Sequence, residues 1–581
     1  MMITLVLSSN MKRMIKNNVL IRKLVGIETA GSLNILFTDK TGTLTKGKME
    51  VIEVRLSNNY CFNSYMEINK YEKYNNLLLN SIIYNTESYY DNNTVIGGNL
   101  TDKCLLEFVK TNKDNNIKIV DKLVFNSKNK YSSVIIEKDK IKEKYIKGAF
   151  ELIINNCEYY YDQYGNKNIL KNKDALLKEI NSITSLGIRA IALAKSNNCN
   201  NVSDINNLTL IGIVYIKDEI REDAKEGIEK VKRANIQTVM ITGDNKNTAI
   251  AIAKEVGLLN NNDLVISHDE LNNLSDKEIK KKIKNLRVVY RALPQDKSRL
   301  VRICQEENLV VGMTGDGVND ALALKKADVG FSLGSGTEVS KEASDIVILD
   351  DNFSSIGVAI LYGRTIFKSI RKFIIFQLTV NLCAVSISII GPFIGIPTPV
   401  TVIQMLWINM VMDTLAGLAF SYEPAKDEYM DELPKKKDEN IINKYMINEI
   451  IITGIYSSLL CILFLKLDII SSLFRKSNDN IYLLTAFFGL FIFISIFNSF
   501  NARTHRLNLF SKIYKNKAFI IVILFIIIVQ IYLIYYGGNL FRTKGLLLNE
   551  FIIMLLISST VIPFDMLRKI YLKKRNLNTG V

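Results

Sequence analysis

One acidic residue near the N-terminus stands where it could act as a nucleophile. Residues 33–38, LNILFT, form a predicted apolar strand, and Asp39 follows them at the start of the loop KTGTLT. Open α/β sheets bind their ligands beyond the carboxyl ends of the strands, which is where this carboxylate would lie. A carboxylate that attacks the γ-phosphorus of a nucleotide forms an acyl phosphate and divides one difficult hydrolysis into two easier steps. We therefore predict that Asp39 becomes phosphorylated.

A second strand and loop, VVGMTGDGVND at 310–320, supplies two further carboxylates. Phosphoryl transfer between negatively charged groups needs a divalent cation to neutralise charge, and Mg²⁺ prefers oxygen ligands. We expect Asp39 and Asp316 to bind Mg²⁺ at this sheet edge. We assign Asp320 and the backbone carbonyl of Thr41 to the same metal site.

A third loop, with Thr242, Gly243 and Asp244, follows another predicted strand. Hydroxyl and backbone N–H groups at such a turn can stabilise phosphate oxygens. Lys297 would place a positive charge against the negative charge that develops during transfer. Each of these motifs is common alone, so the catalytic assignment rests on their occurring together.

The composition excludes several other kinds of chemistry. The formal net charge is +16, but Lys and Asn are spread along the chain without an Arg-rich or aromatic-interleaved patch, so we predict no nucleic-acid partner. The seven cysteines show no CxxC or Cys/His metal spacing and are expected to be reduced, structural thiols. The two histidines, His268 and His505, are far apart in the sequence. The chemistry must therefore come from carboxylates.

The elements that position these residues change character along the chain. Residues 1–24 begin with a short apolar run followed by basic residues, which is typical of the end of a membrane helix and a cytoplasmic stalk. Strands and helices alternate in 25–48 and 209–352, the expected two halves of one α/β domain. The polar segment 49–208 would be a domain inserted between them. Residues 353–581 are expected to form a helical membrane domain.

Apolar stretches in this last part are each close to the roughly 20 residues that a helix needs to cross a bilayer. Basic residues concentrate in the connections at 435–437, 503–517 and 568–575, and the positive-inside rule then places the catalytic half and the C-terminus in the cytoplasm. We predict a multi-pass protein, with the cell membrane as the favoured location; a bundle of buried soluble helices is the alternative. About six spans are expected, at 373–396, 400–421, 447–471, 481–500, 518–537 and 548–567.

Three motifs in this order resemble the P-type ATPases: DKTGTLT at 39–45, MITGDN at 240–245 and MTGDGVND at 313–320. The resemblance covers essentially the whole chain. It implies an α/β, haloacid-dehalogenase-like phosphorylation domain with an inserted α+β nucleotide-binding domain, followed by an α-helical membrane domain. It also implies ATP and Mg²⁺ as cofactors of a cycle that passes through an aspartyl phosphate.

The inserted segment matches the family's nucleotide pocket at several positions. Phe125 resembles the ring that stacks on adenine, and Lys147 with Gly148 resembles a KGA motif that lines the same pocket. Asp102 stands in the place of a family acid that is usually Glu. Arg189 matches an arginine that reaches the ATP phosphates.

Three further residues are assigned to nucleotide binding by the same resemblance. Asp218 and Arg221 fall where the family has the motif DPxR, and Asn319 belongs to GDGVND. Glu219 and Ile220 depart from the family's pattern between the first two, so the turn lacks the rigidity that proline would supply.

Polar residues in two of the expected spans predict the transported ion. Asn381 lies in QLTVN, and Asn409 and Asp413 lie four residues apart in MLWINMVMDT. Such residues are costly in a membrane and are functional by default, and their oxygens suit Ca²⁺. The two stretches resemble the fifth and sixth helices of plasma-membrane-type calcium pumps. Interhelical hydrogen bonding is the alternative role for these three residues.

The resemblance also implies how many ions are carried. Ala384 and Met412 stand where two-ion pumps of the family have Glu and Thr, and neither side chain offers an oxygen. One transported Ca²⁺ is therefore expected.

Two family features have no match in this sequence. These are the actuator domain with its TGE loop and the first membrane helices with the PEGLP motif. We interpret the chain as part of a longer pump, so a missing N-terminal half is an expected partner. The alternatives are a soluble-type phosphatase on the same sheet, a non-pumping nucleotide-binding membrane protein, or a pump for another cation. The sequence indicates no oligomeric state.

Overall fold

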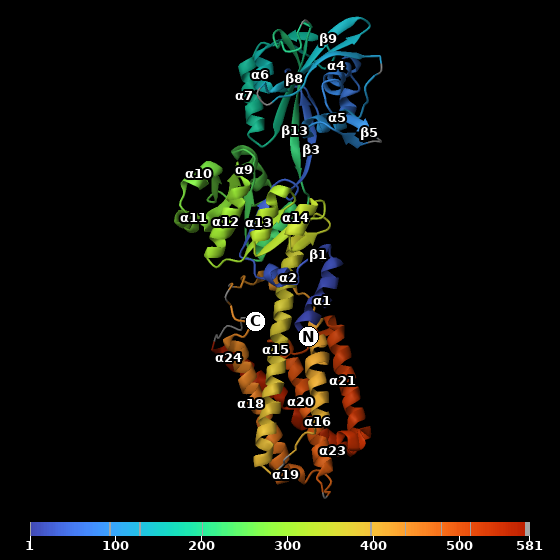
Figure 1. Ribbon diagram of the computed structural model, residues 1–581, viewed down its shortest axis with the longest axis vertical. Coiled ribbons are helices and arrows are strands. Elements are labelled where there is room, and N and C mark those ends of the chain that lie inside the picture. Colours follow the sequence, from blue (N-terminus) through green and yellow to red (C-terminus); the bar gives the residue numbers. More distant parts are fainter. Residues whose placement is uncertain are drawn as a thin grey trace.

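The protein is elongated, with three parts stacked along its longest axis (Figure 1). This computed structural model describes residues 2–575 except 92–93, 115, 127–128, 200, 396–397, 436, 438, 478 and 512. A nine-stranded sheet in residues 45–220 forms the inserted domain at one end, and an eight-stranded sheet in residues 19–44 and 221–353 forms the central domain. The helical domain, residues 354–574, forms the other end.

The central domain is built around strand β2 (Ile35–Asp39), which carries the predicted nucleophile at its end. All its residues before Asp39 are buried, as in a parallel strand that helices cover on both faces. Its parallel neighbours are β14 (Gln237–Ile241) and β17 (Val311–Gly315). The strand order is β1-β19-β18-β17-β2-β14-β16-β15. The other strands are β1 (Val19–Ile21), β15 (Leu264–Ser267), β16 (Leu286–Tyr290), β18 (Val329–Leu333) and β19 (Ile346–Ile348).

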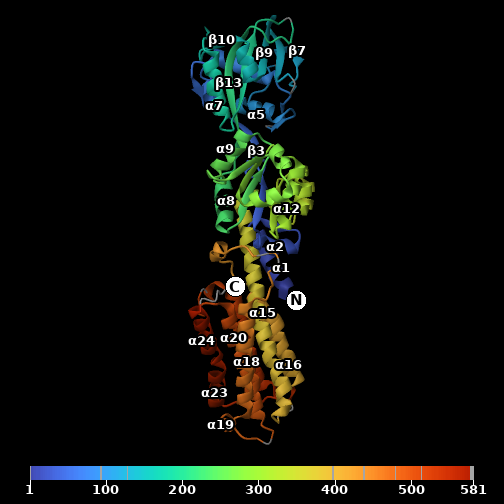
Figure 2. The same cartoon turned by 90° about the vertical axis from the view of Figure 1, so that its left-hand side faces the viewer.

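Helices cover the two faces of this sheet. Leu36 of β2 belongs to the same apolar cluster as α8 (Ala224–Arg233), whereas Ile35 and Phe37 belong to the cluster of α12 (Pro294–Glu306). Figure 2 shows α8 and α12 on opposite sides of the sheet. Alternate residues of one strand point to opposite faces, so both faces must be apolar. The remaining helices of this domain are α2 (Leu24–Gly31), α9 (Lys246–Glu255), α10 (His268–Asn273), α11 (Asp276–Lys282), α13 (Ala321–Lys326) and α14 (Glu338–Ala343).

The inserted domain is joined to the central domain by two long strands. β3 (Thr45–Arg55) leaves directly after the Asp39 loop, and β13 (Leu208–Ile220) returns antiparallel to it, with Ile220 opposite Thr45 (Figure 1). The sheet order is β11-β10-β13-β12-β9-β8-β7, and β3 pairs with both β13 and β4. Its other elements are β4 (Cys61–Phe62), α3 (Tyr65–Ile68), α4 (Glu72–Ile83), β5 (Tyr89–Asp91), β6 (Thr94–Ile96), α5 (Leu100–Val109), β7 (Lys118–Leu123), β8 (Tyr131–Lys138), β9 (Ile141–Ala149), α6 (Phe150–Asn155), β10 (Cys157–Tyr161), β11 (Lys167–Ile169), α7 (Lys173–Thr184) and β12 (Arg189–Ser196).

One long helix connects the central and helical domains. α15 (Ser354–Phe393) has 40 residues and is therefore about 60 Å long, so it runs from the central domain through the length of the bundle (Figures 1 and 2). It crosses α2 with the backbones in contact, because a Cβ added to Gly31 would lie 2.5 Å from the backbone of Gly363. The buried guanidinium of Arg364 donates hydrogen bonds to the carbonyl of Gly31 and to that of Ala234 after α8. Movement of the central domain should therefore be transmitted to α15.

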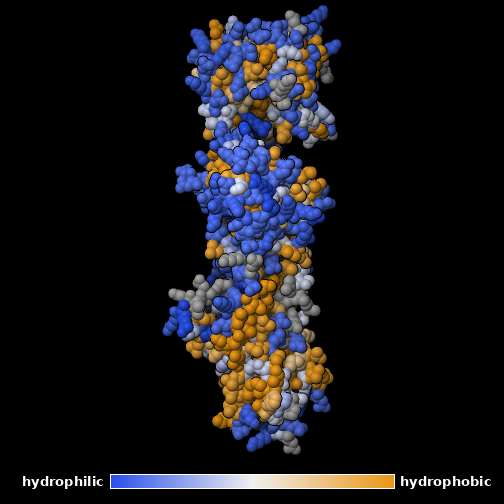
Figure 3. Space-filling view, turned by 60° about the vertical axis from the view of Figure 1, so that its left-hand side comes forward, coloured by the Kyte–Doolittle hydropathy of each residue, from blue (hydrophilic) through white to orange (hydrophobic). Residues whose placement is uncertain are grey.

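The helical domain has the length and polarity of a membrane domain. Five of the described helices are long and apolar enough to cross a membrane: α15, α18 (Lys444–Lys466), α20 (Ile481–Arg503), α21 (Lys517–Tyr536) and the continuous pair α23 (Leu548–Ser559) and α24 (Val561–Lys574). Figure 3 shows apolar side chains over this domain and mostly polar ones over the other two. On α21, Ile521 and Ile528 are 66% and 65% exposed. Exposed apolar surface of this extent indicates contact with lipid.

The stretch 400–421, predicted as one of six spans, is divided differently. It holds α16 (Val402–Asn409), a π-helical segment η3 (Met410–Leu415) and α17 (Ala416–Ser421) in direct succession. No single one of these pieces is long enough to count as a span, which is why five described helices, rather than six, meet the length criterion. π-Helical segments inside helices are often found at functional sites. Helix α1 (Met2–Ile15) packs against α15 and α17 near the start of the chain.

Candidate active site

Three carboxylates meet at one edge of the central sheet. Side-chain oxygens of Asp39, Asp316 and Asp320 all lie within 4.8 Å of one another. They meet because β2 and β17 are adjacent parallel strands, whose carboxyl ends lie at the same edge. Just inside this edge the hydroxyl of Thr314 donates a 2.9 Å hydrogen bond to the hydroxyl of Thr38. Three residues predicted for phosphoryl transfer and metal binding are therefore neighbours.

A single ammonium group holds two of these carboxylates. Lys297, near the start of α12, donates to Asp39 Oδ2 at 3.0 Å and to Asp320 Oδ1 at 2.6 Å. The other oxygen of Asp39 accepts a 2.8 Å hydrogen bond from the backbone N–H of Lys40. Both oxygens of the predicted nucleophile are thus oriented by donors.

The cluster carries more negative charge than its surroundings neutralise. Burial raises the pKa of Asp39, and the nearby charge of Asp320 raises it further, although Lys297 acts in the opposite direction. Burial together with Asp39 and Asp320 raises the pKa of Asp316 to about 6. Burial tends to lower the pKa of Lys297, but the two carboxylates outweigh it and the pKa is raised. The lysine stays charged, and among the residues that the structure describes the three carboxylates form no ion pair with any other cation.

A residue that the sequence analysis did not single out, Lys40, is central to the loop. Its Nζ lies 2.7 Å from Asp218 Oδ2 and 2.9 Å from Asp244 Oδ2, and the side chain is almost completely buried. These carboxylates outweigh burial and raise the pKa of Lys40. Asp218 lies on β13 and Asp244 follows β14, so Lys40 joins the nucleophile's loop to two other elements. Its position directly after Asp39 was the only sequence signal for this role.

The two residues in the place of the family's DPxR motif hold the same loop. Asp218 accepts a 2.9 Å hydrogen bond from the hydroxyl of Thr45. Arg221 donates two hydrogen bonds to the carbonyl of Gly42, from Nη2 at 2.8 Å and from Nε at 3.0 Å. Both were predicted to contact nucleotide, and the contacts in this structure are with the loop that follows Asp39.

The third predicted loop closes on itself. The hydroxyl of Thr242 donates to Asp244 Oδ2 at 3.2 Å and accepts from the backbone N–H of Asp244 at 3.1 Å, with Gly243 between them. Thr242 is 2% exposed. Thr41 and Asn319 are exposed in the loops that flank the carboxylates.

A pair that the sequence analysis missed, the buried Asp296 and the partly exposed His268, supports Lys297. Asp296 Oδ2 accepts from the backbone N–H of Leu293 at 2.8 Å, which closes the start of α12. The same oxygen lies 2.7 Å from Nδ1 of His268, whose Nε2 lies 3.0 Å from the amide nitrogen of Asn272. Because His268 and Asp296 are 28 residues apart, only the fold reveals the pair.

Comparisons with known proteins agree with this geometry. A family model for haloacid dehalogenase-like hydrolases matches residues 33–328, and one described as the C-terminus of cation transporting ATPases matches residues 397–571. A calcium-transporting ATPase of Bacillus cereus is 34% identical over 99% of this chain and 67% of its own length. The chain belongs to the cation-transporting P-type ATPases. The fold class that the sequence motifs implied is thereby confirmed.

Other relatives are longer still. A plasma-membrane-type calcium-transporting ATPase of Arabidopsis thaliana is 34% identical over 92% of the chain and 53% of its own length. A calcium-transporting ATPase of Saccharomyces cerevisiae is 32% identical over 99% of the chain and 64% of its own length. This P-type ATPase chain thus spans about half to two thirds of the length of the relatives it matches.

In this P-type ATPase chain, two of the predicted nucleotide-binding residues form a buried ion pair. Lys147 on β9 contacts Asp102 on α5, and both side chains are only 6% exposed. Burial lowers the pKa of Lys147, and Asp102 opposes that change. Gly148 lies where β9 approaches β8 closely, since an added Cβ would lie 2.5 Å from the carbonyl oxygen of Lys130. The fold therefore accounts for the glycine without a ligand.

The remaining two predicted nucleotide contacts are at the surface. Phe125 follows β7 and is 49% exposed. Arg189 is exposed at the start of β12 and lines a hollow together with Lys40, Asp218 and Asp244. This hollow joins the inserted domain to the loop of the predicted nucleophile.

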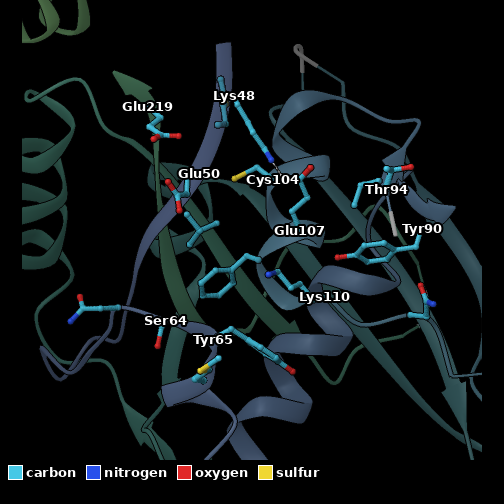
Figure 4. A pocket seen from close by; sticks show the side chains of 17 residues that line it. Lys48, Glu50, Ser64, Tyr65, Tyr90, Thr94, Cys104, Glu107, Lys110 and Glu219 are labelled. Atoms are coloured by element: carbon cyan, nitrogen blue, oxygen red, sulfur yellow. Dashed lines mark ion pairs between the residues drawn. The ribbon is translucent and has the colours of Figure 1, made fainter. Parts of the chain in front are cut away.

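A larger groove in the inserted domain holds none of the predicted residues. It has a volume of about 1230 Å³, and β3, α5 and the β5–β6 hairpin contribute to its walls (Figure 4). An ion pair of 3.2 Å between Lys48 and Glu107 crosses it. Tyr90 and Lys110 also line it. The groove is therefore distinct from the pair formed by Asp102 and Lys147.

The predicted ion-binding residues lie on neighbouring helices. Asn381 is a half-buried residue of α15, and Asn409 is the last residue of α16 and is exposed in this structure. Asp413 belongs to the backbone of η3, but its side chain lies outside the described part of the structure. Segment η3 packs against α15, so the two helices that carry these residues are in contact.

Gly42 is the residue at which the loop tolerates least change. Its φ is +73°, and an added Cβ would lie 1.8 Å from Asp316 Oδ2. Gly42→Ala should cost about 1 kcal/mol from the left-handed backbone and more from the displacement of Asp316, and it should weaken binding of divalent cations to the cluster. Denaturant unfolding and cation titration measure the two effects.

Gly257→Ala is the matched control, because Gly257 has a φ of +76° with no atom within 4 Å of an added Cβ. It should show the backbone cost alone and unchanged cation binding. Equal losses in the two variants would contradict the collision with Asp316.

Proposed function

We propose that this chain carries the catalytic domain and part of the ion path of an ATP-driven calcium pump, in which Asp39 accepts the γ-phosphate of ATP. The observation that carries the proposal is the meeting of Asp39, Asp316 and Asp320 with Lys297 at one sheet edge. In phosphoryl transfer the protein mainly positions the reacting groups and neutralises charge, and this set of residues suits both tasks.

The hydrogen bonds of Asp39 support its role as the attacking group. One carboxylate oxygen would bond to the γ-phosphorus while the bond from phosphorus to the ADP oxygen breaks. The N–H of Lys40 and the ammonium of Lys297 hold the carboxylate in place from its two oxygens. Because the pKa of Lys297 is raised, this ammonium remains available to neutralise charge on the transferred group. Thr242, Gly243 and Asp244 would contact the phosphate oxygens.

The carboxylate cluster fits Mg²⁺. Lys297 contacts two of the three carboxylates, Asp39 and Asp320. The raised pKa values of Asp39 and Asp316 mean that a further positive charge would be favourable. We infer that Asp39, Asp316 and the carbonyl of Thr41 would hold the ion, with Asp320 close to it. Bound Mg²⁺ would supply charge neutralisation during transfer.

The position of Arg189 supports a route for ATP from the inserted domain to Asp39. The adenine would rest on Phe125 beside Lys147, and Arg189 would reach the phosphates. The hollow that Arg189 shares with Lys40 lies between the two domains and near the nucleophile. Strands β3 and β13, which join the domains, would allow them to close on the nucleotide.

The transported ion is proposed from the helical domain and from the relatives. The relatives are named calcium-transporting ATPases, and oxygens of Asn381, Asn409 and Asp413 suit Ca²⁺. The contact between α15 and η3 brings their backbones together. Since Ala384 and Met412 offer no oxygen, we propose one Ca²⁺ per phosphorylated Asp39 in the complete pump.

The phosphorylation site can be tested directly. With Mg²⁺ and γ-labelled ATP the chain should gain an acid-stable, hydroxylamine-labile label, because an acyl phosphate forms. Asp39→Asn should remove the label completely. Asp174→Asn, at an exposed position in α7, is the control and should keep it. Label that survives in Asp39→Asn would show that another residue is the nucleophile.

The pH dependence of cation binding follows from Asp316. Its pKa is raised to about 6, so it is protonated at lower pH and a proton then competes with the cation. The affinity for Mn²⁺, used in place of Mg²⁺ and followed by electron paramagnetic resonance, should be nearly constant above about pH 6. Below that it should fall by about tenfold per pH unit.

Asp316→Asn should bind Mn²⁺ weakly at every pH and without this dependence, while Asp174→Asn should behave as the unmodified chain does. An affinity that does not change between about pH 5 and about pH 7 would contradict the role of Asp316.

The assignment of Ca²⁺ as the transported ion is tested in the complete pump of which this chain is proposed to be a part. Asp413→Asn should abolish Ca²⁺-dependent phosphorylation of Asp39, because it removes a charged ligand from the path. Asp468→Asn, in the connection after α18, should leave it unchanged. Equilibrium binding of radioactive Ca²⁺ should give one ion per phosphorylatable Asp39, and two ions would refute the single-site argument.

A further inference from the structure

Three helices of the membrane domain surround a small cavity that apolar residues, Val380, Phe491 and Ile494, and several polar ones line together. Thr379 and Cys383 of α15, Ser457 of α18, and Ser495 and Asn498 of α20 line it. The cavity has room for about one water-sized guest. Polar groups buried at this depth are costly unless they have partners, so a cavity of this composition needs an explanation.

One residue that lines the cavity, Cys383, has a second thiol beside it, that of Cys461. Sγ of Cys383 lies 3.9 Å from Sγ of Cys461, which is one helical turn beyond Ser457 on α18, and both thiols are buried. The helices approach closely here because Gly454 leaves room for Leu382, which an added Cβ would meet at 2.7 Å. The packing of α15 against α18 therefore brings the two thiols together. The sequence has no CxxC spacing that would predict the pair.

We propose that Cys383 and Cys461 form a binding site for a soft divalent metal ion of the Zn²⁺ or Cd²⁺ class. Tetrahedral coordination with metal–sulfur bonds of about 2.3 Å places two thiolates about 3.8 Å apart. The separation of 3.9 Å between the two sulfurs needs almost no rearrangement to reach this geometry.

The charge balance also favours such an ion. Each thiol loses its proton as its metal–sulfur bond forms, so one ion and two thiols give a neutral dithiolate complex and two protons. A neutral complex avoids the cost of an isolated charge in the bilayer. Thiolates prefer soft ions, whereas Ca²⁺ and Mg²⁺ prefer oxygen. The site is therefore chemically distinct from the proposed path at Asn381, Asn409 and Asp413.

Hydroxyl oxygens line the same cavity as Cys383 and are the candidates for the remaining coordination positions. The hydroxyls of Thr379 and Ser457 donate to carbonyls of their own helices, at 2.7 and 2.8 Å, which leaves their oxygen lone pairs available. Asn498 is 3% exposed, and its amide nitrogen has no partner within the described structure. Rotation of this amide would direct its oxygen into the cavity.

Metal binding at this pair would join α15 to α18. Since α15 is continuous from the central domain to the far end of the bundle, a metal bridge should restrain the helix through which the two domains are coupled. The expected consequence is inhibition of turnover by low concentrations of Cd²⁺.

The binding experiment uses the purified full chain in lipid nanodiscs, reduced with a phosphine, and does not depend on phosphorylation. Titration with Cd²⁺ should produce the ultraviolet charge-transfer band of a cadmium thiolate, with one ion bound and two protons released. Cys383→Ser and Cys461→Ser should each weaken binding by about 100-fold or more. Cys304→Ser removes a buried thiol of the central domain and should change nothing.

A second measurement needs no variant. Cd²⁺ should protect Cys383 and Cys461, mapped by mass spectrometry, from alkylation by N-ethylmaleimide, and Ca²⁺ should not. Protection of other cysteines alone, or a band that persists when both residues are Ser, would overturn the proposal. So would a disulfide between the two that remains after reduction. Loss of Asp39 phosphorylation in Asp39→Asn leaves all these readouts unaffected, so the two proposals fail separately.

Discussion

The crowding of three carboxylates at one sheet edge is the constraint on which the catalytic domain depends. Asp39, Asp316 and Asp320 repel one another in a partly buried place, and burial, with this repulsion added to it, raises the pKa of Asp39 and of Asp316. Lys297 relieves part of it, and a divalent cation would relieve the rest. The same unbalanced negative charge would favour a bound divalent cation, and the proposed phosphoryl transfer would need that cation to offset the repulsion between the carboxylates and the phosphate.

The elements around the cluster fix the positions of the loop that follows Asp39 and of Lys297. Lys40 is bound by carboxylates from β13 and from the loop after β14, and Arg221 holds the carbonyl of Gly42, so the loop after Asp39 has little freedom. The start of α12, which carries Lys297, is closed by Asp296 with His268 beside it. A group fixed before substrate binds needs little reorganisation during a reaction, which is how preorganised sites lower barriers, and this suits the role proposed for Asp39.

The central domain and the membrane domain are connected through one continuous helix, α15. Helix α15 crosses α2 with the two backbones in contact, and Arg364 of α15 binds carbonyls from two elements of the central domain. Changes at Asp39 that shift the central domain would therefore act on a single continuous helix that also carries Asn381. Cys383 lies on the same helix, so a metal ion bound there would oppose that motion.

Local patterns of residue type were enough to predict the strand ends that carry acids, the inserted polar segment and the apolar lengths of the membrane helices. Three contacts depended on tertiary structure: Lys40 with Asp218 and Asp244, His268 with Asp296, and Cys383 with Cys461. The division of residues 400–421 by a π-helical segment was also not predictable from the sequence. The partners in these contacts are 28 to 204 residues apart in the sequence. A local sequence pattern does not predict which distant side chains the packing of strands and helices will bring together.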